Sequence, residues 1–161
     1  MKPKKTYKVL FLCTGNSARS IMAEYILRLR GKGRFETYSA GSTPAGKVNP
    51  MAIEVLEKAF AIDARDARSK SWDEFRNIEF DFVITVCDNA RESCPVWPGQ
   101  PIVAHWGSPD PVLFEGTHEK KFQHFRDVGS QINSRIGIFC AFRDEQLDKM
   151  HVAQVGQKFK I

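Results

Sequence analysis

Two residues with the chemistry to hold and attack an oxyanion lie close together near the start of the chain, in the stretch from Cys13 to Ser20, Cys-Thr-Gly-Asn-Ser-Ala-Arg-Ser. Arg19 offers a planar fork of N–H donors that fits two oxygens of a tetrahedral anion. The thiolate of a cysteine is a nucleophile, and the positive field of an arginine and of a helix N-terminus lowers its pKa. The pattern predicts that Cys13 is a thiolate near neutral pH and attacks an anion held beside it.

The residues between Cys13 and Arg19 suit an anion-binding turn. Gly15 adopts positive φ without strain, and Asn16 tolerates it better than most residues. In a strand-to-helix turn, successive backbone N–H groups and the start of the helix face the anion. Ser20 is expected to donate a hydrogen bond to the thiolate and to help cap the helix. The predicted anion-binding residues are Thr14, Gly15, Asn16, Ser17, Ala18, Arg19 and Ser20.

A second group of reactive side chains lies later in the chain. Cys87 ends another apolar run, and Cys94 follows it by seven positions in the stretch TVCDNARESCPVWPG. Taken singly, Cys87 is also compatible with a buried strand-end thiol and Cys94 with a surface thiol. Asp110, in the stretch HWGSPDP, is a candidate general acid or an ordinary turn residue. His105, Trp106 and Cys140 are interpreted as packing residues.

The elements that must position these residues alternate along the chain. Apolar runs predict strands at 7–13, 34–41, 80–87 and 100–106, and helical spacing predicts helices at 20–31, 51–60 and 117–142, with a short helical piece near 71–76. Such alternation indicates an α/β fold of three layers, an open parallel four-stranded sheet with helices on both faces. Ligands bind such sheets at the carboxyl ends of the strands, where Cys13 and Cys87 are expected.

Length and composition narrow the class of protein. A chain of 161 residues is expected to form a single domain, 1–161, with a core over about 7–142 and a tail over 143–161 that is either a helical turn or a solvated end. The net charge of +5 is scattered, which argues against nucleic-acid binding. No apolar run approaches 18 residues, so no membrane span is predicted. The cytoplasm is the expected compartment, where the four cysteines are thiols at rest.

The stretch from Cys13 to Ser20 has the pattern C-x5-R-S and resembles the phosphate-binding loop of low-molecular-weight protein tyrosine phosphatases and of the arsenate reductases that share their fold. The resemblance runs from about Tyr7 to Phe142. It implies that Cys13 attacks the central atom of the oxyanion and that Arg19 holds its oxygens. The strand order expected for this architecture, 2-1-3-4, would place Cys87 near Cys13.

The later pattern C-x6-C-P, followed by HWG and DP, resembles thioredoxin-linked arsenate reductases. The resemblance implies arsenate as substrate and a cascade in which Cys87 attacks the sulfur of Cys13, Cys94 forms a disulfide with Cys87, and thioredoxin (or glutaredoxin) reduces it. Asp110 would protonate the departing oxygen. The expected protein is a monomer with no bound cofactor and no metal.

Two alternatives stay open at this point. A tyrosine phosphatase would need Cys13, Arg19 and Asp110 but neither Cys87 nor Cys94. Such phosphatases usually place aromatic residues after the Asp-Pro acid, whereas valine and leucine follow here. A thiol redox sensor without enzymatic activity would need the cysteine pair but no acid.

Two further expectations concern geometry and cations. A helix over 88–94 would separate Cys87 and Cys94 by about 10 Å along its axis, and a disulfide requires Cα atoms within roughly 7 Å. The segment 88–97 is therefore predicted to be irregular or to unwind, with Cys94 toward the surface. Some thioredoxin-linked relatives bind potassium near the loop, and Asn16, Glu24 and Ser39 match three of their four ligands. Lys70 stands at the fourth position, which predicts no potassium requirement.

Overall fold

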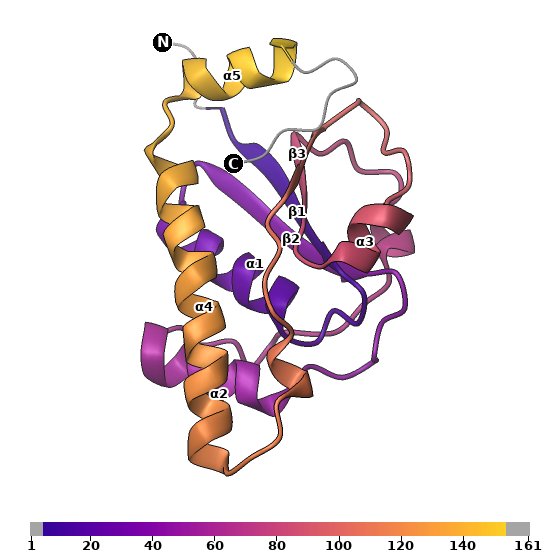
Figure 1. Cartoon of the computed structure of the whole chain (residues 1–161). Coiled ribbons are helices and arrows are strands. Elements are labelled where there is room, and N and C mark those ends of the chain that lie inside the picture. The colour runs from indigo at the N-terminus through magenta and orange to yellow at the C-terminus, as the bar shows by residue number, and fades with distance from the viewer. Residues whose placement is uncertain (1–4, 154–161) are drawn as a thin grey trace.

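A computed structural model of the chain describes residues 5–153 and contains a four-stranded parallel sheet (Figure 1). Its strands are β1 (Tyr7–Cys13), β2 (Phe35–Gly41), β3 (Phe82–Thr85) and β4 (Ile102–His105). They are ordered β2-β1-β3-β4, and every neighbouring pair is parallel. The predicted four-stranded parallel sheet with order 2-1-3-4 is confirmed.

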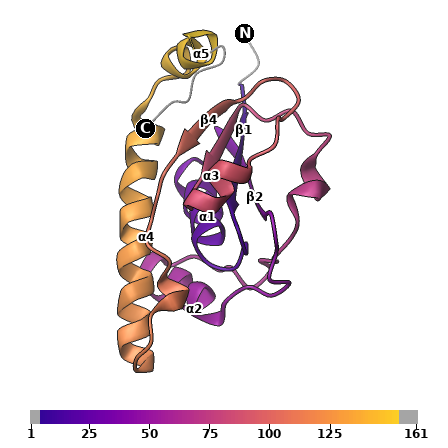
Figure 2. The same ribbon diagram turned by 45° about the vertical axis from the view of Figure 1, so that its right-hand side comes forward.

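Helices cover both faces of the sheet (Figure 2). On one face, α1 (Arg19–Arg30) packs on β1 and β2, and α4 (His118–Ala141) packs on α1 and on α2 (Pro50–Phe60). On the other face, the short helix α3 (Asp88–Ser93) contacts β1 and β3. The 3-10 turns η1 (Trp72–Phe75) and η2 (Pro111–Leu113) complete the connections. This arrangement leaves the carboxyl ends of β1 and β3 side by side.

The helices begin where the sequence supplies caps. Asn49 accepts a hydrogen bond from the backbone N–H of Met51, and Pro50 occupies the first turn of α2, where its missing N–H costs nothing. Thr117 caps α4 in the same way. The buried residues of α4 recur every three or four positions, so that one side of this long helix enters the core: Phe125, Val128, Gly129, Ile132, Ile136 and Phe139.

Strands β3 and β4 are shorter than the predicted 80–87 and 100–106. At β3, the residues at the two ends of the predicted run make contacts outside the sheet. Phe80 packs edge-to-face against Trp97 and Tyr38 on the α3 side of the sheet. Cys87 leaves the ladder to become the N-cap of α3. The apolar runs therefore identify the strands, while their ends are set by contacts from distant parts of the chain.

The region after residue 143 is a helix rather than a solvated end. Helix α5 (Asp144–Ala153) lies beyond the end of the sheet at which β1 begins (Figure 1). Leu147 is fully buried, the hydroxyl of Tyr7 donates to Asp148 Oδ1 at 2.9 Å, and Arg34 pairs with Asp144 at 2.8 Å. The remainder of the predicted tail, 154–161, lies outside the described residues. Within residues 5–153, no helix is long and apolar enough to cross a membrane.

Candidate active site

The loop between β1 and α1 is shaped by its neighbours. The carbonyl oxygens of Thr14, Gly15 and Ser17 accept hydrogen bonds from backbone N–H groups of the segment 43–49, at 2.8 to 3.0 Å. In a trans peptide the following N–H points the opposite way, so the N–H groups after these carbonyls point toward the inside of the loop. Asn16, at φ 47°, makes the left-handed turn. The loop is thus a ring of inward donors, which favours an anion.

The end of strand β2 lies close to the backbone of the loop. A Cβ on Gly41 would lie 2.5 Å from the Thr14 carbonyl oxygen and 3.0 Å from that of Cys13. Real Cβ atoms do not come this near to backbone atoms, so a side chain at position 41 would displace the loop. The glycine therefore helps to fix the position of the loop backbone.

A buried polar network supports the loop from behind. The side-chain amide of Asn16 donates to Ser20 Oγ at 2.8 Å and to Ser39 Oγ at 3.0 Å. Lys70 Nζ donates to Ser39 Oγ at 3.1 Å and to Asn16 Oδ1 at 3.3 Å, and lies 3.8 Å from Glu24. Burial lowers the pKa of Lys70, and Glu24 opposes this shift. Lys70 thus lies among Asn16, Glu24 and Ser39, the three residues at which the resemblance suggested a cation site.

The structure corrects the expected capping role of Ser20. The N-cap of α1 is Ala18, with no side-chain hydrogen bond, and Ser20 already lies within the helix. Its Oγ accepts from Asn16 instead. Because α1 begins at Arg19, one residue earlier than predicted, Ser20 faces the buried network rather than the helix end.

Cys13 and Cys87 meet at the carboxyl end of the sheet. Both are buried, and the thiol of Cys13 donates a hydrogen bond to Cys87 Sγ. Thr14 adds its backbone N–H at 3.3 Å from the same sulfur, with its hydroxyl also at 3.3 Å. The hydrogen bond from Cys13, followed by those from Thr14, lowers the pKa of Cys87 to about 5. The sulfur pair therefore holds one negative charge at neutral pH.

In this arrangement the pKa shifts of the two sulfurs run against the predicted thiolate at Cys13. The hydrogen bond to Cys87 and burial raise the pKa of Cys13, and these effects outweigh the opposing charge of Arg19. Arg19 is engaged elsewhere: its Nη1 donates to the Ser108 carbonyl at 2.9 Å and its Nη2 lies 3.5 Å from Asp110 Oδ2. The negative charge consequently rests on Cys87, which has more donors around its sulfur.

Asp110 lies beside the loop, as expected from its sequence context. One carboxylate oxygen caps η2 by accepting from the Val112 N–H at 3.0 Å, and the other faces Arg19. The structure thus brings Asp110, Arg19, the loop and Cys87 together around Cys13. The carbonyl of Ser108 as a partner of Arg19 was not predicted, since a backbone acceptor leaves no signal in the sequence.

Cys94 lies at the far end of α3 from Cys87. It is half-buried at the C-cap, whereas Cys87 is the N-cap. Seven residues at the helical rise separate the two by about 10 Å, beyond the reach of a disulfide, and all four cysteines are thiols. Linking Cys87 to Cys94 thus requires α3 to unwind. The mobility expected for 88–97 stays a prediction.

Other expected packing residues behave as such. Trp106 is fully buried against Phe11 and Phe139, and Cys140 is half-buried on α4. Thr14 was predicted only as an anion-binding residue, and its contacts with Cys87 were missed. The pairing of β1 with β3 could have revealed them, because it places the residue after Cys13 beside the end of β3.

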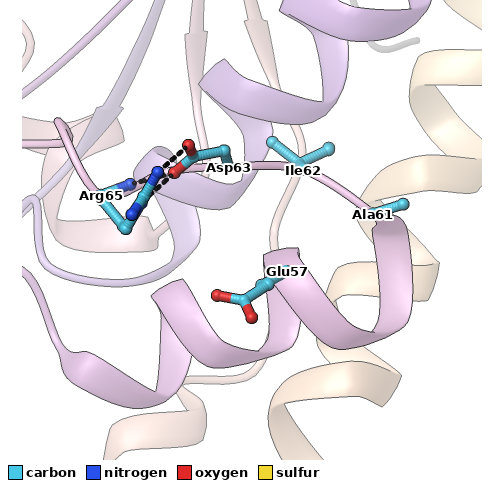
Figure 3. Close-up of a pocket in the computed structure, with 5 residues that line it drawn as sticks. All are labelled: Glu57, Ala61, Ile62, Asp63 and Arg65. Atoms are coloured by element: carbon cyan, nitrogen blue, oxygen red, sulfur yellow. Dashed lines mark hydrogen bonds and ion pairs between the residues drawn. The ribbon is translucent and has the colours of Figure 1, made fainter.

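Two surface hollows lie outside the loop. A hollow of about 390 Å³ at the end of α2 is lined by five residues, among which Asp63 and Arg65 form an ion pair (Figure 3). The other, of about 440 Å³, lies between the start of α2, η2 and the start of α4. None of the residues that line either hollow belongs to the loop 13–20 or to α3.

Comparison with known proteins agrees with this geometry. The family model for low molecular weight phosphotyrosine protein phosphatases matches residues 8–152. An arsenate reductase from Halalkalibacterium halodurans is 39% identical over 132 residues, covering 82% of this chain and 94% of that protein. A solved structure of an arsenate reductase in the phosphate binding state has a TM-score of 0.72 at 30% identity, covering 84% of this chain and 98% of that one.

The thioredoxin-dependent arsenate reductase of Corynebacterium glutamicum is also similar, with a TM-score of 0.62 at 26% identity over 95% of this chain and 66% of that one. The family model spans nearly the whole chain, and the sheet order, the loop and the position of Cys13 fit it. The chain belongs to the low molecular weight phosphotyrosine protein phosphatase family.

Proposed function

We propose that this protein is an arsenate reductase that works through Cys13, Cys87 and Cys94. The observation that carries the proposal is the second thiol, Cys87, hydrogen-bonded to Cys13 at the mouth of the loop. Transfer of a phosphoryl group needs one thiolate and an acid, whereas reducing arsenate needs two electrons and hence a second thiol. The similarity to arsenate reductases supports the same assignment.

In the first step, the backbone of residues 14–19 holds arsenate, and Arg19 turns from Ser108 and Asp110 toward its oxygens. Cys13 Sγ attacks arsenic, and an As–O bond breaks. The thiol proton of Cys13 and the proton of hydrogen arsenate leave with that oxygen as water, and Asp110 passes the proton to it. The product is an arsenic(V) group bonded to Cys13.

In the second step, the thiolate of Cys87 attacks the sulfur of Cys13. The S–As bond breaks and its electron pair stays on arsenic, so arsenic(V) becomes arsenite and the two sulfurs become a disulfide. The low pKa of Cys87 suits this role, because Cys87 stays a thiolate while Cys13 delivers its proton to the leaving water. The negative charge on Cys87 therefore favours the second step, and the proton on Cys13 is used in the first.

In the third step, Cys94 attacks Cys87 Sγ, releases Cys13 as a thiol and leaves a Cys87–Cys94 disulfide. An external dithiol then reduces this disulfide. Thioredoxin is the proposed donor, in line with the similarity to a thioredoxin-dependent enzyme; glutaredoxin is the alternative. The proposed setting is the cytoplasm, where such donors keep thiols reduced, and the proposed form is a monomer of one domain, 1–161, without a bound cofactor or metal.

The test is a thiol count and peptide map of the reduced protein before and after one equivalent of arsenate, with no other reductant. The expected result is loss of two thiols with a Cys87–Cys94 linkage, or a Cys13–Cys87 linkage in Cys94→Ser. Cys140→Ser is the matched control and should behave as the wild type.

Two outcomes would contradict the proposal. Thiols untouched by arsenate, with aryl phosphate cleavage intact in Cys87→Ser, would indicate a phosphatase. The other outcome is a Cys87–Cys94 disulfide that forms with peroxide but not with arsenate. If it also forms equally fast in Asp110→Asn, the protein would be a redox sensor.

A further inference from the structure

His105, the last residue of β4, contacts the first turn of α3. The sequence analysis predicted only a packing role for this histidine. His105 Nε2 lies 3.0 Å from Asp88 Oδ1, and Asp88 is the first residue of α3. A carboxylate only accepts, so Nε2 carries a proton and donates it. The contact joins a strand of the rigid sheet to the helix that separates Cys87 from Cys94.

The imidazole ring of His105 is held in one orientation. Its Nδ1 lies 2.8 Å from Thr85 Oγ1 on the neighbouring strand, and only 15% of its side chain is exposed. The backbone at Gly107 packs against the ring, since a Cβ there would lie 3.0 Å from Nε2. A ring supported on these sides presents Nε2 to Asp88 as a fixed donor.

Two sets of contacts therefore hold the first turn of α3. The inner set belongs to Thr14, whose N–H donates to Cys87 Sγ and whose hydroxyl accepts from Asn89 at 3.1 Å. The outer set is His105 with Asp88, which also lies 3.9 Å from Arg91. Once Cys87 forms a disulfide with Cys13, its sulfur loses the negative charge that made it a strong acceptor. The outer contact involves no sulfur and is unaffected by that change.

We propose that His105 is a positioning residue that keeps α3 helical through its contact with Asp88, and that this contact opens when Cys94 moves to attack Cys87. The role in the reaction rests on the proposed arsenate reductase function. The contact itself belongs to the reduced protein and can be tested without arsenate.

The first test is hydrogen exchange of the α3 amides in the reduced protein, comparing Asp88→Ala with Glu92→Ala. Both variants remove one carboxylate from the same short helix, and both side chains are exposed, so folding is preserved. Asp88→Ala should speed exchange about two- to fivefold, the range expected for a partly exposed charged contact. Glu92→Ala should leave it at the wild-type rate.

The second test follows the conversion of the Cys13–Cys87 disulfide to Cys87–Cys94 after one equivalent of arsenate. Asp88→Ala should accelerate this step by a similar factor, while aryl phosphate cleavage, which needs neither Cys87 nor Cys94, stays at the wild-type rate. His105→Phe keeps the ring volume and should act in the same direction. Adding His105→Phe to Asp88→Ala should bring no further acceleration, because both remove one contact.

Equal exchange in Asp88→Ala and Glu92→Ala would overturn the proposal, as would faster exchange with an unchanged disulfide step. A third outcome is faster hydrogen exchange in Asp88→Ala together with thiols that do not react with arsenate. It would overturn the proposed function and still establish that His105 holds α3.

Discussion

Cys13 ends β1 and Cys87 follows the end of β3 by two residues, and the segments after the two cysteines are built differently. After Cys13, the loop 14–18 is backed by Gly41 and by the buried network around Asn16 and Lys70. After Cys87, α3 has six residues, of which only Ala90 is buried, and is attached mainly through side chains of its first turn. The first segment is fixed by buried backbone contacts, and the second can be released by breaking a few exposed ones.

This difference matches the two demands of the proposed chemistry. Binding and attack at a tetrahedral anion require donors held in place beforehand. Carrying a disulfide from Cys13 outward to Cys94 requires a segment that changes shape, and local unfolding is least costly where few apolar side chains are buried. The predictions below test whether the two segments can be separated by experiment.

The largest effect is expected from the two buried cysteines. Cys13→Ala should lower both arsenate reduction and aryl phosphate cleavage by about four orders of magnitude or more, because it removes the nucleophile of both reactions. Cys87→Ser should abolish arsenate turnover and leave aryl phosphate cleavage near the wild-type rate. Steady-state assays of both variants on both substrates measure this. Parallel losses in Cys87→Ser would show that the two segments do not act separately.

Asp110→Asn should lower the rate of aryl phosphate cleavage about 10²- to 10⁴-fold, the usual contribution of a general acid. The asparagine can still accept from the Val112 N–H, so the start of η2 should be preserved. Disulfide formation between Cys87 and Cys94 driven by a chemical oxidant should proceed at the wild-type rate, because α3 is intact. An equal slowing of both reactions would point to a general disturbance of the fold.

Lys70→Met tests the rigidity of the loop. Removing the ammonium leaves the buried carboxylate of Glu24 with Arg28 and the Ser39 hydroxyl as partners, and it takes one of their donors from Asn16 and from Ser39. The free energy of unfolding should fall by about 3 kcal/mol. By contrast, Glu92→Ala on α3 should change it by less than about 0.5 kcal/mol. Urea denaturation of the reduced proteins gives both values.

The pH dependence of thiol alkylation reports on Cys87 in the reduced protein. Its pKa is lowered to about 5, with the contact to Cys13 as the largest cause, so before arsenate binds it is a thiolate above that pH and a thiol below it. In Cys94→Ser, the rate at which iodoacetamide alkylates Cys87 should be constant from pH 6 to 8 and fall about tenfold per unit below pH 5. Peptide mapping after timed quenching provides the rate. An increase through pH 8 to 9 would mean that Cys87 has the pKa of an ordinary thiol.

Much of this arrangement could be predicted from local patterns. The strands at Tyr7–Cys13 and Phe35–Gly41, the sheet order and the loop follow from apolar runs, from glycine and asparagine in the turn and from the family resemblance. The charge on the sulfurs could not, because the pKa of Cys13 depends on a hydrogen bond to a residue 74 positions away and on the direction in which Arg19 points. The choice between a helical turn and a solvated end after residue 143 could not be made either, because the contacts that hold α5 come from distant residues, such as Tyr7 to Asp148 and Arg34 to Asp144.

The smallest expected effect is that of potassium. In the wild type, turnover in potassium and in sodium at equal ionic strength should be the same, because Lys70 Nζ already contacts Asn16 and Ser39 and lies near Glu24. Lys70→Asp replaces the ammonium with a carboxylate beside Asn16, Glu24 and Ser39, which gives this position an oxygen ligand for a cation. That variant should therefore gain a dependence on potassium, measured as a rise in turnover and in thermal stability when sodium is replaced. Stimulation of the wild type, or none in Lys70→Asp, would mean that the ammonium does not take the place of a cation, and the rigidity of the loop would then need another source.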